Sequence, residues 1–207
     1  MLTKYIMKPY SIISVSFIIL LISCMSEKTI IRKYYTLEIP GDKYISVPDT
    51  SPVIPGKCEI GRVDINPVYG RNQIVNRNNS NEITYYMYHQ WAVRPDEAIR
   101  EVLHEYLQKR KLFETVSTRF NRSIPDYILE TSVNDLEIIE IDKSFSAHVN
   151  VEFLLVLNST DSILVQHKAD RAEPLKQKNI NLFASEVSNI LFEELEVFAN
   201  LIMGKEY

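Results

Sequence analysis

The chain has 207 residues, of which 24% are charged, and its formal net charge is −4. Nucleic-acid binding needs clustered lysine and arginine, so a mildly acidic chain is not expected to bind DNA or RNA. The sequence also lacks a glycine-rich phosphate loop and the H-E-x-x-H, C-x-x-C and G-x-S-x-G patterns, which speaks against the commonest enzyme classes. The length suits one domain.

The N-terminus has the pattern of a bacterial lipoprotein leader. Lys4 and Lys8 precede an apolar run of 11 residues, Ile12–Ile22, which is too short to span a hydrocarbon core that needs about 20. The run ends in Leu21-Ile22-Ser23-Cys24, the arrangement of a lipobox. We expect residues 1–23 to be removed as a signal peptide and Cys24 to carry a covalent lipid, with no other cofactor. The alternative is an ordinary signal peptide or anchor that happens to contain a cysteine.

Residues 24–33 would then form a lipidated tether ahead of a single domain at 34–207. Fully extended, the tether reaches at most ~30 Å, which keeps the domain close to its membrane. The acidic mature chain gains little from anionic lipid, so the acyl chains, at about 0.8 kcal/mol per buried CH₂, supply the attachment. The residue after Cys24 is Met25 and not aspartate, which favours the outer membrane and a domain that faces the periplasm.

The first half of the domain predicts short strands and a hairpin. A loop rich in proline and glycine covers 40–57, and Asn66-Pro67 ends the strand that follows it. The last two strands form the hairpin, with a polar turn at 78–81. The expected strands cover 34–39, 58–65, 73–77 and 82–91.

The second arm of this hairpin is unusually aromatic. Its alternation places Ile83, Tyr85, Met87 and Trp91 on one face, and Tyr86 and Tyr88 on the other. One interpretation is core packing with cross-strand aromatic pairs. The other is a surface that contacts lipid or a partner, because one helical layer cannot bury aromatic side chains on both faces.

Two amphipathic helices follow from the spacing of apolar residues. Pro95 and two acidic residues open the first helix, and Lys109-Arg110-Lys111 closes it. The second helix covers about 181–203. The expected buried stripes are Ile99, Val102, Leu103, Tyr106 and Leu107 in the first helix, and Val187, Leu191, Leu195, Phe198 and Ile202 in the second.

The segment between the helices predicts further strands. They cover 115–118, 126–141 with a bulge near Asn134-Asp135, 145–157 with clean alternation, and 163–169. The order of elements predicts an α/β (α+β) fold: a two-layer sandwich with a mainly antiparallel sheet and two amphipathic helices on one face.

Few residues are candidates for chemistry. Cys58 is left unpaired once Cys24 is acylated; it is either a redox or nucleophilic thiol or a small buried residue, and the lack of a C-x-x-C partner favours the latter. Three groupings combine histidine with carboxylates, but each fits a solvated face better than a metal site, because further ligands are missing. They are Glu101 with His104, His148 with Asn150 and Glu152, and His167 with Asp170. We expect no metal.

Three stretches resemble a known family. They are Tyr34-Tyr35-Thr36-Leu37, the segment Gly61–Val75 and the stretch His89–Ala92 ahead of the first helix. Over 34–107 they are similar to the ABC-type transport auxiliary lipoproteins, the PqiC-like family. Asn72 stands after Arg71 where that family often has proline.

The resemblance implies an accessory role in transport and no enzymatic activity. Its members serve an ABC transporter and an MCE-domain protein that move phospholipids or other lipids between two membranes, and a ring-shaped MCE partner would favour a homo-oligomer. We expect Pro67–Val75 and the aromatic hairpin to dock the MCE protein. The candidate contact residues are Pro67, Tyr69, Arg71, Gln73, Tyr86, Tyr88 and Trp91. The alternative is an outer-membrane assembly lipoprotein of a β-barrel or lipopolysaccharide translocon.

Overall fold

The computed structural model describes residues 31–43, 45–48, 52–78 and 81–205. The expected signal peptide, Cys24 and most of the tether lie outside the described residues, so they stay predictions. The described elements all belong to one compact unit, Arg32–Tyr207. Neither helix in this part of the chain combines the length and the apolar character that crossing a bilayer requires.

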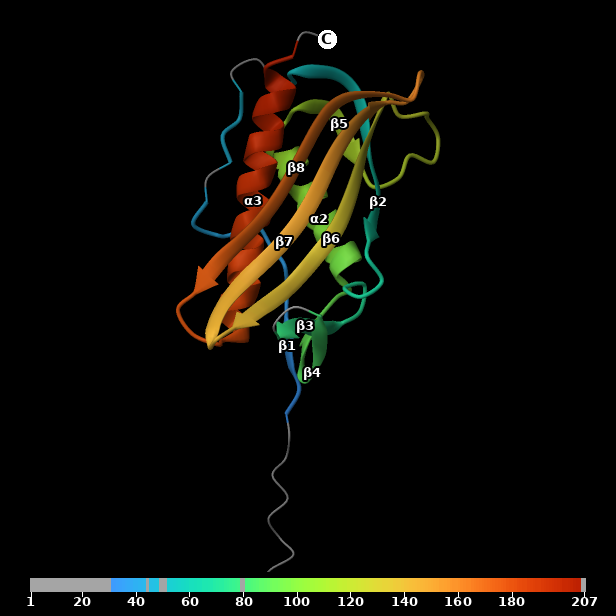
Figure 1. Cartoon of the computed structure of the whole chain (residues 1–207). Helices are drawn as coiled ribbons and strands as arrows, with labels where there is room; N and C mark the ends of the chain where they lie inside the picture. The colour runs from blue at the N-terminus through green and yellow to red at the C-terminus, as the bar shows by residue number, and fades with distance from the viewer. Residues whose placement is uncertain (1–30, 44, 49–51, 79–80, 206–207) are drawn as a thin grey trace, which may run out of the picture. The chain divides into compact units, whose positions relative to one another are not determined.

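Eight strands and two helices make up the unit (Figure 1). In chain order they are β1 (Lys33–Tyr35), β2 (Ile54–Ile65), β3 (Gln73–Asn78), β4 (Glu82–Trp91), α2 (Pro95–Arg110), β5 (Phe113–Ser117), β6 (Tyr127–Ile141), β7 (Ser144–Leu157), β8 (Ser162–Leu175) and α3 (Ile180–Met203).

The sheet is mixed, so the prediction of a mainly antiparallel sheet is wrong. The pairs β3–β4, β6–β7 and β7–β8 are antiparallel, but β1–β4, β2–β5, β2–β6 and β3–β6 are parallel. Strands β2 and β3 follow each other along the same edge of β6, and β7 occupies the other edge. Alternation in a sequence shows which face of a strand is buried, but it carries no information about the direction of a neighbour that is distant in the chain.

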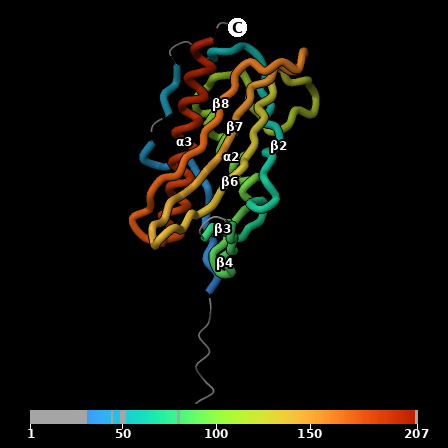
Figure 2. Tube along the Cα trace, viewed as in Figure 1, coloured from blue at the N-terminus to red at the C-terminus, as the bar shows by residue number. Residues whose placement is uncertain are grey.

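Both helices lie on one side of the sheet, where the long strands β6–β8 curve across them (Figures 1 and 2). All ten residues of the two predicted helical stripes are buried. Helix α3 begins at Ile180, because the side chain of Asn179 accepts hydrogen bonds from the N–H groups of Asn181 (2.8 Å) and Leu182 (3.2 Å). The helices and the sheet share a single apolar core.

Most strand predictions hold, but the first strand, predicted at 34–39, covers only Lys33–Tyr35. The hairpin arms and the bulge are confirmed, since β3 pairs with β4 and the β6–β7 register shifts between Val133 and Asp135. Strand β2 begins earlier than predicted, at Ile54, whose N–H donates to the carbonyl of Leu112 (2.9 Å). Strand β8 is longer, and it continues to Leu175 beside β7. These extensions depend on neighbours that the local pattern does not show.

Candidate functional site

The two segments predicted for docking meet at one end of the domain. The hydroxyl of Tyr85 in β4 donates to the carbonyl of Val68 (3.4 Å), and the guanidinium carbon of Arg71 lies 5.5 Å from the centre of the Tyr85 ring. The N–H of Trp91 donates to the carbonyl of Asn72 (2.6 Å). The loop 66–72 therefore packs on the hairpin, and the two form one continuous surface.

The exposed part of this surface combines apolar, aromatic and cationic side chains. Met87 is 70% exposed, Tyr85 39% and Tyr88 37%, and Pro67 and Arg71 are also exposed. We call these five residues the hairpin surface. The β3–β4 register shifts between the pairs Gln73–Gln90 and Val75–Tyr85, so β4 bulges between these two pairs, and Met87 and Tyr88 lie exposed within the bulge.

The seven predicted contact residues have different environments. Pro67, Arg71 and Tyr88 are exposed, while Gln73 and Tyr86 are half-buried. Tyr69 and Trp91 are buried, at 2% and 3% exposure. The Trp91 ring packs on the ring of Phe183 in α3, with centroids 5.8 Å apart. The aromatic cluster is thus divided: Trp91 belongs to the core, and Tyr85 and Tyr88 face outward.

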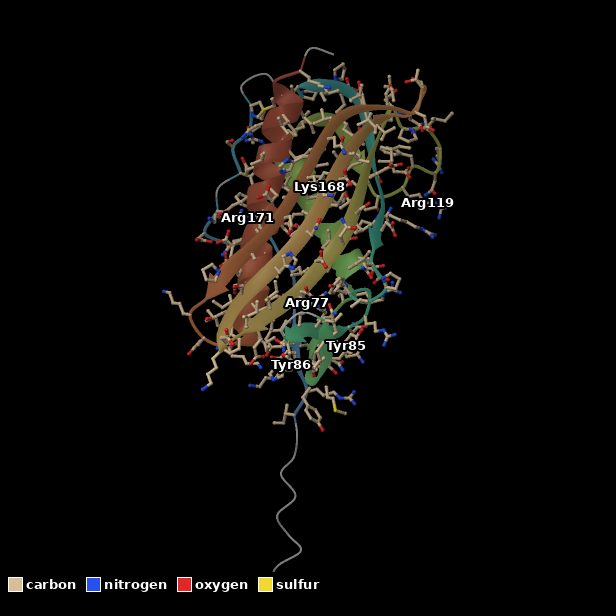
Figure 3. All side chains as sticks on the ribbon, in the orientation of Figure 1. Arg77, Tyr85, Tyr86, Arg119, Lys168 and Arg171 are labelled. Carbon is tan, nitrogen blue, oxygen red and sulfur yellow. The ribbon has the colours of Figure 1, made fainter. Side chains whose placement is uncertain are left out.

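Tyr69 anchors the loop 66–72 to the sheet through hydrogen bonds with polar side chains. Its hydroxyl lies 2.8 Å from Glu137 Oε2 and 2.9 Å from Asp135 Oδ1, and it accepts from Arg77 Nη2 (2.9 Å). Arg77 Nε also donates to Glu137 Oε1 (2.6 Å). Glu137 is only 1% exposed, so its charge is compensated by these partners inside the protein. Figure 3 labels Arg77, Tyr85 and Tyr86, which all lie at this end of the domain.

His148 extends this network across the sheet from β7 to β8. Its Nε2 lies 2.8 Å from Asp170 Oδ1, and its Nδ1 lies 3.4 Å from Glu137 Oε1. The hydrogen bond to Glu137 raises the pKa of His148; burial opposes the rise, and Asp170 supports it. Burial alone would raise the pKa of Glu137, but hydrogen bonds from His148, Arg77 and Tyr69 lower it below its ordinary value.

The same residues offer metal-ligating atoms. Ligand atoms of Asp135, Glu137 and His148 lie within 4.8 Å of one another. However, Arg77 already donates to Glu137 at 2.6 Å, and a guanidinium beside the carboxylate opposes a second cation. The arrangement therefore fits an ion-pair network that fixes the loop 66–72.

This network predicts a pH dependence of stability. A raised His148 pKa contributes stability below the ordinary value of 6.5 and loses it as the pH rises through the folded-state pKa. A lowered Glu137 pKa contributes stability above 4.5 and loses it as the pH falls through the folded-state pKa. We expect the free energy of unfolding of the His148→Gln variant to fall furthest below wild type near pH 5–6, and the difference to shrink above pH 7. Urea denaturation of both proteins from pH 4 to 9 measures this; a pH-independent difference would contradict it.

Comparison with known proteins assigns the chain to a family. Residues 35–194 match the family model described as ABC-type transport auxiliary lipoprotein component. The chain belongs to this family. The match extends well beyond 34–107, the part of the chain in which the sequence resemblance is strongest. The family description is that of a transport accessory lipoprotein.

Two solved structures share the fold. A crystal structure of a Xanthomonas campestris protein of family DUF330 is 16% identical, with a TM-score of 0.69 over 83% of this chain and 96% of that one. A second crystal structure, of an uncharacterized protein, is 13% identical, with a TM-score of 0.63 over 82% and 97% of the two chains. No curated protein matches the chain. At these identities the likeness shows the fold alone.

Within this family fold, no sequence pattern predicts the groups that hold the loop 66–72. Arg77 and Glu137 lie 60 positions apart, and β3 and β6 bring them together. The only sequence signal was the predicted bulge at Asn134-Asp135, which places Asp135 and Glu137 beside Tyr69. Cys58 is fully buried, and burial raises the pKa of its thiol to about 12, as suits a core residue and not a nucleophile.

Proposed function

We propose that this chain is the lipid-anchored accessory component of an ABC transport system, that Cys24 carries the anchor, and that the domain docks an MCE-domain protein for lipid transport across the periplasm. The family match over 35–194 carries the proposal. The hairpin surface is the proposed docking surface.

The composition of the hairpin surface supports this assignment. Tyrosine, methionine and arginine are enriched in protein–protein interfaces, and Met87 and Tyr88 are exposed in the described part of the chain. The loop beneath is held by Tyr69 and Glu137, so its exposed side chains are pre-organised, which reduces the entropy that binding costs.

The place of the surface along the chain is consistent with a role next to a membrane. Strand β1 pairs with β4, with Lys33 opposite His89. Lys33 lies nine positions after Cys24, so a chain anchored at Cys24 holds this end of the domain within about 30 Å of the lipid surface. A partner that acts at that membrane would lie beside the hairpin surface.

Charge reversal at Arg71 tests the docking surface. We expect Arg71→Glu to lower recovery of the MCE-domain protein about tenfold or more, the effect of losing ~1.4 kcal/mol of binding free energy. The measurement is an affinity pull-down of the acylated protein from crosslinked, detergent-solubilised envelopes, read by mass spectrometry. Arg119→Glu is the matched control, because Arg119 is exposed and lies away from the hairpin (Figure 3).

Each result of the pull-down has a definite meaning. Recovery of an MCE-domain protein with wild type and Arg119→Glu, but not with Arg71→Glu, supports the proposal. Equal recovery with Arg71→Glu would move the docking surface elsewhere. Recovery of a β-barrel protein without any MCE-domain protein would favour an outer-membrane assembly role, and the family match would then speak to fold alone.

A further inference from the structure

A groove lies between the hairpin, the β6–β7 turn and the segment that leads into α3. Its volume is about 690 Å³, within the range of small-molecule sites. Three tyrosines and Met87 supply its apolar wall, and the polar lining comes from all three segments. The lining includes Asn76, Tyr86, Glu140, Asp142, Lys143 and Lys178.

Asn76 lines the groove, and its side chain has a buried acceptor without a partner. The residue is 3% exposed, and its Nδ2 donates to Asn78 Oδ1 and to Glu140 Oε2 (3.1 Å). These two oxygens fix the amide orientation, so Oδ1 is the free end. Among the described residues, Asn76 Oδ1 is one of four buried side-chain polar atoms with no hydrogen-bond partner. Buried acceptors are normally satisfied, so this atom calls for a donor.

The charges of the groove are balanced in sign. Glu140 and Asp142 supply two carboxylates, and Lys143 and Lys178 supply two ammonium groups. Lys178 Nζ pairs with Glu140 Oε2 at 2.5 Å, and it lies 6.0 Å from the centre of the Tyr86 ring. Lys178 is 41% exposed and Glu140 26%, so solvent and a ligand can reach the pair. A ligand with a single charge would break this pair and leave one of its members uncompensated, whereas a ligand with both charges can satisfy both.

We propose that this groove binds a zwitterion that carries a primary ammonium group and a phosphate, as in phosphoethanolamine. The ammonium offers three N–H donors to a place rich in acceptors, namely Asn76 Oδ1 and the carboxylates of Glu140 and Asp142. The phosphate meets Lys143 and Lys178. The Tyr86 ring adds a face suited to a cation. The source of the zwitterion is a phospholipid headgroup, and this part alone rests on the proposed function.

Binding is measured on the chain from residue 24 onwards with Cys24→Ser, by calorimetry and amide NMR shifts. The probes are dihexanoyl phosphatidylethanolamine, the matching phosphatidylcholine and phosphatidylglycerol, free phosphoethanolamine, and a glucose oligosaccharide. We expect the ethanolamine lipid to bind at least tenfold more tightly than the other two lipids, since choline has no N–H donor and glycerol has no positive charge. The shifts should centre on residues 76, 86, 140 and 178.

Lys178→Gln should weaken binding at least tenfold, and Lys176→Gln, an exposed lysine two positions away that does not line the groove, should leave it unchanged. Lys178 is partly exposed, so its variant tests binding without endangering the fold; Lys143→Gln is a second such variant.

Other results would overturn the proposal. Equal binding of the ethanolamine and choline lipids would remove the role of the N–H donors. Oligosaccharide binding in place of lipid would identify a polyol site, and no binding of any probe would remove the site altogether. Free phosphoethanolamine that binds as tightly as the lipid would overturn the lipid source while keeping the zwitterion. None of these results depends on recovery of an MCE-domain protein, so the site and the proposed function fail independently.

Discussion

Replacing Trp91 by alanine should lower the free energy of unfolding by about 3–5 kcal/mol, the cost of deleting a large buried aromatic side chain. Trp91 is 3% exposed, and its ring packs on Phe183 of α3. Its backbone also closes the loop, because Asn72 Nδ2 donates to its carbonyl (3.0 Å). Removal of the Trp91 ring leaves a cavity where β4 meets α3. Urea denaturation followed by circular dichroism measures the change.

The matched control lies on the same strand. Tyr88 is 37% exposed, and Tyr88→Ala should change the free energy of unfolding by about 0.5 kcal/mol or less. Because Tyr88 belongs to the hairpin surface, the same variant should weaken recovery of the partner protein. A Trp91→Ala variant as stable as Tyr88→Ala would show that Trp91 is not a core residue.

The second large effect is expected at Glu137. Replacing it by alanine leaves the guanidinium of Arg77 and the hydroxyl of Tyr69 without their buried carboxylate, and we expect a loss of about 3 kcal/mol in the free energy of unfolding. The figure is at the low end for a buried pair because Arg77 is 27% exposed and regains some hydration. The measurement is again urea denaturation, at pH 6, where His148 also contributes.

Glu130→Ala is the control for this variant. Glu130 is exposed on the same strand β6, and its removal should cost about 0.5 kcal/mol or less. A Glu137→Ala loss no larger than that of Glu130→Ala would mean that the network with Tyr69 and Arg77 contributes nothing to stability. In that case the loop 66–72 would be held mainly by its contacts with the hairpin.

These two residues link stability to the proposed docking role. Trp91 ties the hairpin to α3, and Glu137 ties the loop 66–72 to the sheet through Tyr69. The exposed side chains Arg71 and Tyr88 project from these two fixed segments. Substitutions of Trp91 or Glu137 destabilise these segments but leave the hairpin surface unchanged. They should therefore weaken docking less at low temperature than near the unfolding transition.

The family and the local elements were already determined by the sequence. Both helices, the hairpin and the bulge at Asn134-Asp135 follow from patterns with periods of 3.6 or 2 residues, and such patterns report burial of one face. The stretch from Tyr34 to Ala92 held enough of the family pattern to indicate an accessory lipoprotein. The predicted lipobox at Cys24 also depends only on neighbouring residues, and it stays a prediction.

The tertiary structure alone decided how distant segments meet. Parallel pairing of β2 and β3 with β6 joins residues 62 to 69 positions apart, and no local pattern encodes the direction of such neighbours. The same pairing brings Arg77 to Glu137. Tyr69, which was expected to contact a partner protein, instead donates a buried hydrogen bond to Glu137. Packing against Phe183 of α3 buries Trp91, while Tyr88 on the same strand stays exposed. The tertiary structure also brings Asn76, Glu140 and Lys178 to one groove. Burial and partners depend on which elements cover a strand and not on the residue type itself.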